Sequence, residues 1–341
     1  MSLSIDKTSF QKAPEDFKPS WLLKNRHVQS LLASSKLRKP KIMRRAAGLL
    51  AAQREVLLPG GGDVRLHSLV SEHKQSGKPN ERKPSLVILI HGWEGSAESI
   101  YLLSAASVLF NAGFDVVRLN MRDHGPSHHL NAELFHGGRL DEVVHACGAI
   151  NREYPRKNTS LVGFSLGGNF ALRVATKAKE NGLRLDRVVA VSPVVNPMNT
   201  MRSIEQGWAA YRKYFIKKWR TSLEKKQQAF PGSVDISGLM QNKNLMSMTD
   251  SLIQCHTGFE SVENYFNSYA LIGDKLASID VPTDIITAAD DPVIPVVDFA
   301  LTQPSAAVQC RVLPAGGHCG FIKDLGFNSW IDEELLRLLA G

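Results

Sequence analysis

The hydrophobic positions of the chain alternate between short, continuously apolar runs and longer runs with helical spacing. The short runs cover residues 85–90, 115–119, 158–162, 187–191, 284–287 and 308–313. Their length and apolar content predict buried strands. Residues 100–111 and 169–179 carry apolar positions three and four apart, which predicts helices. This alternation predicts an α/β fold with a mostly parallel central sheet and helices on both faces.

Four further segments flank this pattern. Residues 55–59 and 64–69 predict a hairpin around a glycine-rich turn. Residues 21–32 predict a short helix, and residues 330–339 predict a C-terminal helix that packs on the sheet. Residues 71–84 are polar and predict an exposed loop.

The alternation breaks after the strand at 187–191. Residues 197–280 show no strand pattern and contain ten aromatic residues, so we expect a helical lid inserted between the sixth and seventh predicted strands. Most of these aromatics are expected to form the lid's own core, with Trp208 and Tyr214 as candidates for the pocket wall. The chain is thus divided into an arm (1–50), a core (51–196 and 281–341) and a lid (197–280).

The first candidate for chemistry is a serine between a strand and a helix. Ser165 lies in Gly163-Phe164-Ser165-Leu166-Gly167, directly after the run 158–162. G-x-S-x-G at such a turn resembles the nucleophile elbow of α/β-hydrolases, where small neighbours leave room for a strained serine backbone. A serine hydroxyl is a weak nucleophile until a base takes its proton. Ser165 is therefore a nucleophile only if an acid and a histidine accompany it.

Both partners follow in the order that α/β-hydrolases use. Asp290 and Asp291 come after the run 284–287, and His318 follows the run 308–313 within a glycine-rich segment. Ligand sites of parallel sheets lie at these carboxyl ends. The stretch Asp291-Pro292-Val293-Ile294-Pro295 resembles the D-x-x-x-P of many α/β-hydrolases, which favours Asp291 over Asp290 as the acid that orients His318.

The loop after residues 85–90 is expected to supply the oxyanion hole. The run 85–90 leads into His91-Gly92-Trp93-Glu94-Gly95, at the position of the oxyanion loop. A tetrahedral oxyanion needs preorganised donors. The backbone N–H groups of Trp93 and Leu166 are assigned to this role.

Several motifs resemble the YheT-like branch of α/β-hydrolases, of the AB hydrolase 4 type. The first is Asn25-Arg26-His27-Val28-Gln29-Ser30-Leu31, in which Ser30 stands where the branch has Thr. The second is the loop that begins at His91. The third and fourth are Asn120-Met121-Arg122-Asp123-His124-Gly125 and Gly317-His318-Cys319-Gly320-Phe321. The third departs from the branch's N-x-R-G-x-x-G at Asp123 and His124. The resemblance implies a serine hydrolase acting on carboxylic esters, with short acyl chains or lipids as substrates.

Apolar runs and the spacing of cysteines and histidines bear on the location of the protein and on metal binding. The first twenty residues lack an apolar core and no run approaches the length of a membrane span, so a cytoplasmic protein is expected. The four cysteines, at 147, 255, 310 and 319, show no zinc or disulfide spacing, and Cys319 is assigned to packing. The histidines at 124, 128, 129 and 136 fit no zinc pattern and are expected at the site mouth. No cofactor and no metal are expected.

The formal net charge is +8. The arm contributes Lys36, Arg38, Lys39, Lys41, Arg44 and Arg45, and the lid contributes Arg212, Lys213, Lys217, Lys218 and Arg220. A solvated basic face is favoured, and a peripheral contact with an anionic membrane through the basic lid or arm stays open. No nucleic-acid motif is present.

The sequence therefore predicts a carboxylic-ester hydrolase acting on a small-molecule ester through a Ser165–Asp291–His318 triad. A thioesterase, lactonase or acyltransferase with the same triad is the alternative, because one acyl-enzyme serves all of them. A non-catalytic interaction protein on this fold is a remote third, which the joint presence of Ser, Asp and His argues against. The sequence leaves the oligomeric state open.

Overall fold

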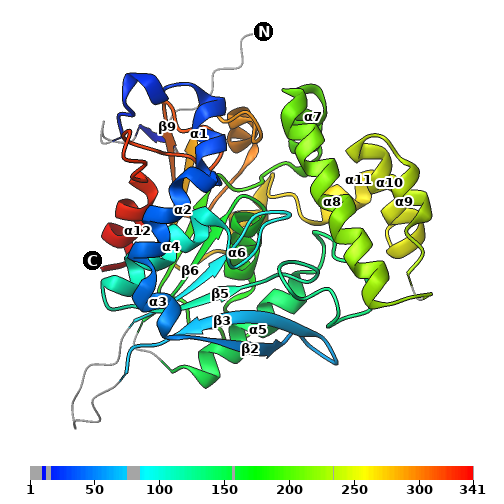
Figure 1. Cartoon of the computed structure of the whole chain (residues 1–341), viewed down its shortest axis with the longest axis horizontal. Helices are drawn as coiled ribbons and strands as arrows, with labels where there is room; N and C mark the ends of the chain where they lie inside the picture. The colour runs from blue at the N-terminus through cyan, green and yellow to red at the C-terminus, as the bar shows by residue number, and fades with distance from the viewer. Residues whose placement is uncertain (1–9, 13–16, 75–84, 156–157, 233, 341) are drawn as a thin grey trace.

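The structure, a computed structural model, describes residues 10–12, 17–74, 85–155, 158–232 and 234–340. Its centre is a nine-stranded sheet in the order β1-β9-β8-β7-β6-β4-β5-β3-β2 (Figure 1). The strands are β1 (Phe10–Lys12), β2 (Gln53–Pro59), β3 (Arg65–Ser71), β4 (Leu86–Ile90), β5 (Asp115–Leu119), β6 (Thr159–Phe164), β7 (Arg187–Val191), β8 (Thr283–Ala288) and β9 (Val308–Leu313). The seven neighbouring strands β1-β9-β8-β7-β6-β4-β5 pair in parallel. Strands β3 and β2 extend the sheet beyond β5 in antiparallel pairing.

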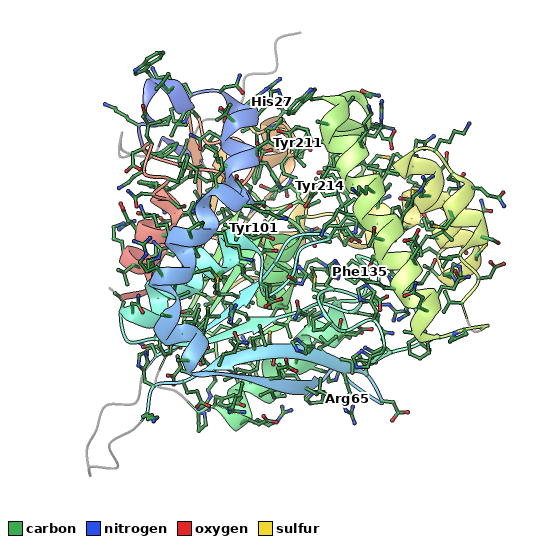
Figure 2. All side chains as sticks on the ribbon, viewed as in Figure 1. His27, Arg65, Tyr101, Phe135, Tyr211 and Tyr214 are labelled. Carbon is green, nitrogen blue, oxygen red and sulfur yellow. The ribbon has the colours of Figure 1, made fainter. Side chains whose placement is uncertain are left out.

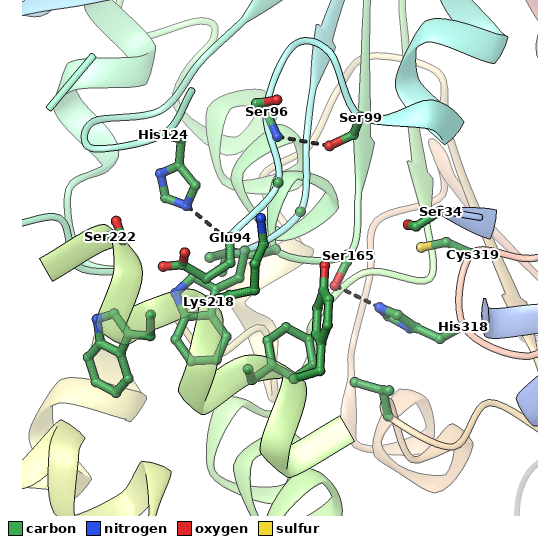
Figure 3. A pocket seen from close by; sticks show the side chains of 18 of the residues that line it. Ser34, Glu94, Ser96, Ser99, His124, Ser165, Lys218, Ser222, His318 and Cys319 are labelled. Carbon is green, nitrogen blue, oxygen red and sulfur yellow. Dashed lines mark hydrogen bonds between the residues drawn. The ribbon is translucent and has the colours of Figure 1, made fainter. Parts of the chain in front are cut away.

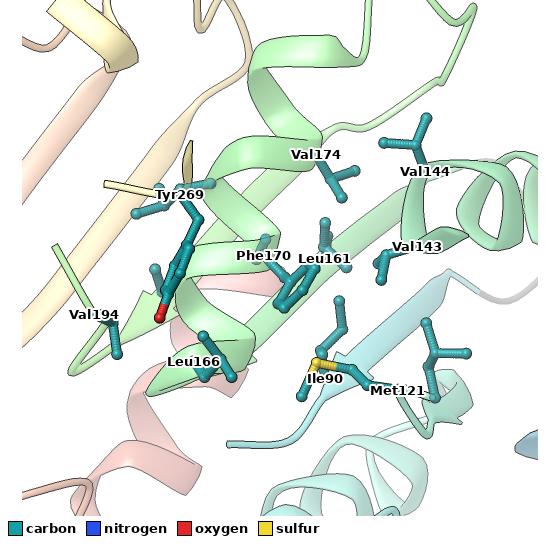
Figure 4. Close-up of a cluster of buried hydrophobic side chains, with 14 of the residues drawn as sticks. Ile90, Met121, Val143, Val144, Leu161, Leu166, Phe170, Val174, Val194 and Tyr269 are labelled. Atoms are coloured by element: carbon teal, nitrogen blue, oxygen red, sulfur yellow. The ribbon is translucent and has the colours of Figure 1, made fainter. Parts of the chain in front are cut away.

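The central strands are buried on both faces, as their continuous apolar runs predict. In β4, Leu86, Ile88 and Ile90 belong to the larger hydrophobic cluster on one side of the sheet. Val87 and Leu89, which point the opposite way, belong to the cluster on the other side. The sheet therefore lies between two cores, and Figure 4 shows part of the larger one around Ile90, Leu161 and Phe170.

Helices cover both faces. On one side, α4 (Ile100–Asn111) packs against α12 (Trp330–Ala340), α2 (Lys39–Arg45) and α3 (Ala47–Ala51). On the other side, α5 (Leu140–Glu153) packs against α6 (Leu166–Lys177) and the sheet. The predicted α/β architecture with a mostly parallel sheet is confirmed. None of the helices within the described ranges is both long and apolar enough to cross a membrane.

The stretch between β7 and β8 is helical wherever the structure describes it, apart from loops and an isolated bridge between Gly273 and Thr302. Its elements are α7 (Pro197–Gln206), α8 (Ala209–Ala229), α9 (Ser237–Gln241), α10 (Leu245–His256), α11 (Val262–Ser268) and the 3-10 helix η4 (Asp274–Leu276). We call α7 to α11 the inserted helices. They stand to one side of the sheet, with α8 as the long helix nearest to it (Figure 1).

The N-terminal region is more broken than its pattern predicts. The expected helix at 21–32 is a 3-10 helix, η2 (Trp21–Leu23), followed by α1 (Arg26–Ala33). Asn25 causes the break, because its side chain accepts hydrogen bonds from the N–H groups of His27 and Val28 and so starts a new helix. A further 3-10 helix, η3 (Lys36–Arg38), leads into α2.

Other boundaries shift by a few residues. The hairpin is present as β2 and β3, which extend the predicted strands to Gln53 and Ser71. The predicted helix at 169–179 begins at Leu166 and ends at Lys177. The expected loop at 71–84 falls largely on residues 75–84, outside the described residues. A last 3-10 helix, η5 (Val296–Leu301), follows β8.

Candidate active site

The turn between β6 and α6 places Ser165 at the carboxyl edge of the sheet. Its backbone is strained, with φ 54° and ψ −118°, values that L-residues rarely adopt. The turn is tight enough that a Cβ on Gly163 would lie 2.1 Å from the Gly167 carbonyl oxygen, and one on Gly167 would lie 2.4 Å from the carbonyl oxygens of Ile90 and His91. Both glycines are therefore required by close backbone approach, and the strained turn presents the Ser165 hydroxyl to the cavity.

His318 lies against this hydroxyl. Its Nε2 is 2.9 Å from Ser165 Oγ, and its Nδ1 is 2.9 Å from Asp291 Oδ2. Because an ionised carboxylate only accepts hydrogen bonds, Nδ1 carries the proton and Nε2 is free to accept from the serine. Figure 3 shows the Ser165–His318 contact at the wall of the pocket.

The two adjacent aspartates have different environments. Asp291 is buried, and its second oxygen accepts hydrogen bonds from the N–H groups of Val293 and Ile294, at 2.8 and 2.9 Å. Asp290 instead accepts a 2.9 Å hydrogen bond from the Gly317 N–H. The structure thus brings Asp291 to the imidazole and uses Asp290 to hold the loop that carries His318.

The neighbours of His318 offset its burial. Burial is the largest single influence and lowers the pKa of His318, but the Asp291 carboxylate and Cys319 together outweigh it, so the pKa of His318 lies well above its ordinary value. An imidazolium in this position is therefore stabilised, as expected for a base that takes a proton from serine during attack.

The segment after β4 approaches the serine closely. A Cβ on Gly92 would lie 3.2 Å from Ser165 Cβ. The N–H of Gly92 donates to the Tyr101 hydroxyl and that of Glu94 donates to His124 Nε2. Within the described part of the chain, the intervening Trp93 N–H and the Leu166 N–H donate to no protein group. These two amides are therefore available to an oxyanion beside Ser165.

Sequence reasoning did not find the residues that fix this loop. His124 Nδ1 lies 2.6 Å from the Arg122 carbonyl oxygen, so it carries the proton and leaves Nε2 to accept from Glu94. Burial holds the pKa of His124 well below its ordinary value, which keeps it neutral. The only sequence signal was the departure from the branch motif at Asp123 and His124. In Glu94, whose N–H donates to His124, burial raises the pKa of the side-chain carboxyl to about 8.

Asp123, the other departing residue, is tied to the inserted helices. Its carboxylate accepts a 2.7 Å hydrogen bond from Lys226 of α8 and a 2.8 Å bond from the Phe135 N–H. Lys226 is fully buried and also donates to the Asn131 carbonyl oxygen. A buried charge of this kind is tolerated only when it is paired and hydrogen-bonded. The pair therefore fixes the second half of α8 to the core.

A cavity of about 860 Å³ opens beside Ser165 and His318. Seven of the ten aromatic residues between 197 and 280 line it, namely Tyr211, Tyr214, Phe215, Trp219, Tyr265, Phe266 and Tyr269. Eight of the ten are also buried in the larger hydrophobic cluster or packed against it, so most of them form a core, as expected, and this core is continuous with that of the sheet. Trp208, expected in the wall, is half exposed and does not line the cavity, whereas Tyr214 does.

The histidines after β5 line this cavity in part. His124, His128 and His136 are in its wall, whereas His129 is exposed and outside it. His128 Nε2 is 2.9 Å from Ser222 Oγ of α8. Among the residues that the structure describes, no three His, Cys, Asp or Glu side chains converge as metal ligands would. Cys319 is buried and also lines the cavity, with its N–H donating to Ser192 Oγ.

Comparison with known proteins agrees with this fold. A family model described as the alpha/beta hydrolase fold matches residues 85–325. The chain belongs to the α/β-hydrolase family.

Within that family, the chain is 27% identical over 343 residues to the putative esterase YheT of Escherichia coli K12, covering 97% of this chain and 95% of that protein. This similarity confirms the resemblance to the YheT-like branch. The chain is also 24% identical over 258 residues to the mouse monoacylglycerol lipase ABHD2, covering 70% of this chain and 60% of that longer protein. These esterase and lipase relatives support hydrolase activity for the chain.

Solved structures of hydrolases share the fold. An esterase of Pyrococcus furiosus, Pf2001, superposes with a TM-score of 0.55 at 19% identity, covering 86% of this chain and 94% of that one. The 2-hydroxy-6-oxo-6-phenylhexa-2,4-dienoate hydrolase of Rhodococcus sp. RHA1 also reaches 0.55, at 18% identity, covering 85% of this chain and 99% of that one. At such identity the likeness concerns the fold alone.

Proposed function

We propose that this protein is a serine hydrolase that cleaves carboxylic esters through an acyl-enzyme on Ser165. The observation that carries the proposal is the continuous chain of hydrogen bonds from Ser165 through His318 to Asp291, at the wall of a cavity of about 860 Å³. A chain of this kind activates a serine hydroxyl for attack on an acyl carbon, because the histidine takes the hydroxyl proton as the new bond forms.

In the proposed first step, Ser165 Oγ attacks the ester carbonyl carbon while His318 Nε2 takes the hydroxyl proton. The carbonyl oxygen becomes an oxyanion, which the N–H groups of Trp93 and Leu166 stabilise. Collapse of the tetrahedral intermediate breaks the bond to the leaving alkoxide oxygen, and His318 returns the proton to it.

In the second step, water attacks the acyl carbon of the ester on Ser165, and His318 takes the water proton. Collapse of this second intermediate releases the carboxylic acid and restores the serine hydroxyl. Asp291 keeps its negative charge throughout and holds the imidazole in the productive tautomer.

The inserted helices are proposed as the lid that selects the acyl chain. Met201 of α7 and Tyr214 of α8 line the cavity. A mainly apolar wall of this size accommodates an acyl chain and discriminates weakly per methylene.

The test is a profile of kcat/KM on p-nitrophenyl esters of increasing chain length, with a thioester and a lactone beside them. Tyr214→Ala and Met201→Ala are expected to change the preference between long and short chains by about 1–3 kcal/mol in relative kcat/KM, because they remove apolar wall. Hydrolysis of the acetate ester should persist. Trp208→Ala is the matched control, since Trp208 precedes α8 without lining the cavity.

An unchanged profile in both cavity variants would remove the inserted helices from substrate selection. A preference for the thioester or the lactone over every oxygen ester would contradict the proposed substrate class.

A further inference from the structure

The basic residues of the chain are gathered in two segments. Residues 17–52 contain nine Lys and Arg and no Asp or Glu, and residues 206–223 contain five Lys and Arg and no Asp or Glu. The positive charge of these two segments together exceeds the formal net charge of +8, so the remainder of the chain carries a net negative charge. The positive charge is therefore local to the N-terminal helices and the first half of α8.

The same two segments carry most of the exposed apolar side chains. Of the twelve large apolar residues that are exposed among the described residues, eight lie within 21–43 and 208–214. They include Trp21, which is 76% exposed, Leu37, which is 71% exposed, and Leu31, which is 52% exposed. Such a concentration on one part of a protein surface marks an interaction site.

Contacts join the two segments. His27 Nδ1 of α1 is 3.0 Å from the Tyr211 hydroxyl of α8, and its ring centroid is 5.1 Å from that of Trp208. Figure 2 shows His27, Tyr211 and Tyr214 following one another where α1 faces α8. We call the exposed apolar and basic side chains of residues 21–44 and 208–218 the rim surface.

The rim surface borders the cavity. Leu31, Met43 and Tyr214 are exposed and also line it, and so are Lys36, Lys39 and Lys218. Six of the exposed basic residues, Lys24, Lys36, Lys39, Arg44, Lys213 and Lys217, form no ion pair with any residue that the structure describes. Their charge is therefore available to an outside partner.

We propose that the rim surface docks the protein on an anionic lipid bilayer and faces the mouth of the cavity toward the membrane. Apolar side chains among unpaired basic ones match the boundary between acyl chains and anionic headgroups. A nucleic acid would use the charge but not the exposed leucines and methionine. The proposal deepens the proposed function, on which it rests for its substrate, by making a membrane lipid ester the source.

The experiment measures binding and needs no catalysis. Full-length protein is sedimented with vesicles of phosphatidylcholine alone or mixed with phosphatidylglycerol, and the Ser165→Ala variant is run in parallel. Binding is expected only with phosphatidylglycerol, and it should weaken as salt is added. Because vesicle binding is read without turnover, an inactive chain that still binds separates failure of the proposed function from failure of docking.

Variants outside the cavity wall locate the surface. Lys213→Glu/Lys217→Glu should weaken binding by about tenfold or more through lost headgroup attraction, and Trp21→Ser/Leu37→Ser by about tenfold through lost apolar insertion. The matched controls are Lys179→Glu/Arg184→Glu, exposed basic residues that follow the end of α6, and Leu57→Ser on β2. Hydrolysis of p-nitrophenyl acetate in solution checks that each variant is folded.

Equal binding to both vesicle types, no binding to either, or equal losses in the control variants would overturn the proposal. Binding that is insensitive to Trp21→Ser/Leu37→Ser and is displaced fully by single-stranded DNA would assign the surface to nucleic acid instead.

A separate observation concerns the serine of the N-terminal motif. Ser30 Oγ accepts a 2.8 Å hydrogen bond from the His318 N–H and donates at 2.7 Å to the Arg26 carbonyl oxygen. The next residue back, Gln29, is fully buried and donates to the carbonyl oxygens of Leu23 and Ile322 while accepting from the Ile322 N–H. Helix α1 therefore holds the catalytic-histidine loop at His318 and again at Ile322.

The loop depends on this contact because its backbone is strained. Gly317 has φ +55°, and a Cβ there would lie 2.3 Å from the Arg26 carbonyl oxygen. Cys319 and Phe321 have φ 54° and 49°. We infer that Ser30 is a positioning residue, which sets the imidazole of His318 by anchoring its backbone.

Four variants isolate the hydroxyl. Ser30→Ala and Ser30→Val are expected to lower kcat about tenfold with KM nearly unchanged, as loss of one orienting hydrogen bond predicts. Ser30→Thr keeps the hydroxyl and should stay within about threefold of the wild type. Thermal unfolding midpoints are measured for all three, beside Ser35→Ala as a control that loses only the cap of η3.

The inference fails if Ser30→Thr is as impaired as Ser30→Val, or if Ser30→Ala and Ser30→Val are destabilised but keep the wild-type kcat. The Thr and Val pair has matched volume, so the comparison stays decisive even where Ser30→Ala does not fold.

Discussion

Ser165→Ala is expected to lower kcat for a p-nitrophenyl ester by about 10⁵- to 10⁶-fold, because no other group can form the acyl-enzyme and removal of the nucleophile costs about as much as removal of the whole triad. KM should change little, since the cavity wall is intact. Steady-state kinetics at high enzyme concentration measures the residual rate.

The control for this variant is its thermal unfolding midpoint. Ser165 is a small side chain at a strained turn, and alanine fits its backbone no worse than serine, so the unfolding midpoint should be close to that of the wild type. A well-folded Ser165→Ala protein with more than about 1% of the wild-type kcat would contradict the nucleophile assignment.

Asp291→Asn is expected to lower kcat by about 10³- to 10⁴-fold. The oxygen of the new amide should stay with the N–H donors of Val293 and Ile294, which now satisfy the carboxylate. Its NH₂ then faces His318 Nδ1, which must accept rather than donate. The proton moves to Nε2, and the imidazole can no longer accept the proton of Ser165.

The pH profile provides a second readout for the same pair. Activity requires neutral His318, so kcat/KM should fall as the pH drops through the pKa of His318. Because Asp291 raises that pKa well above its ordinary value, the acidic limb of the wild type should lie above pH ~6.5. In Asp291→Asn the limb should move to lower pH.

The neighbouring carboxylate is the matched control. Asp290 accepts a hydrogen bond from the Gly317 N–H of the histidine loop, and an asparagine oxygen can still accept that bond. Asp290→Asn should therefore stay within about tenfold of the wild-type kcat. A larger loss in Asp290→Asn than in Asp291→Asn would reverse the assignment of the acid.

The strands of the core were predictable because each is a short apolar run buried on both faces. The predicted bounds 115–119, 187–191 and 308–313 agree with β5, β7 and β9. Candidate residues at the ends of such strands converge because parallel strands bring their carboxyl ends to one edge. This is why Ser165, Asp291 and His318 could be proposed from sequence.

Other features depend on contacts between distant segments. The split of the helix at 21–32 follows from the capping geometry of Asn25, which periodicity alone does not show. The position of the aromatics of the inserted helices depends on how α8 meets the core, and the buried Asp123–Lys226 pair fixes that meeting. The bonds from Gln29 and Ser30 to the histidine loop span more than 280 residues.

The residue that a covalent inhibitor modifies tests most sharply whether Ser165 is the nucleophile. The wild-type protein is treated with a fluorophosphonate, its intact mass is measured, and the modified peptide is sequenced by tandem mass spectrometry. One adduct is expected for each chain, located on Ser165, with loss of esterase activity in proportion to labelling. An adduct on another residue, or equal labelling of Ser165→Ala, would contradict this assignment.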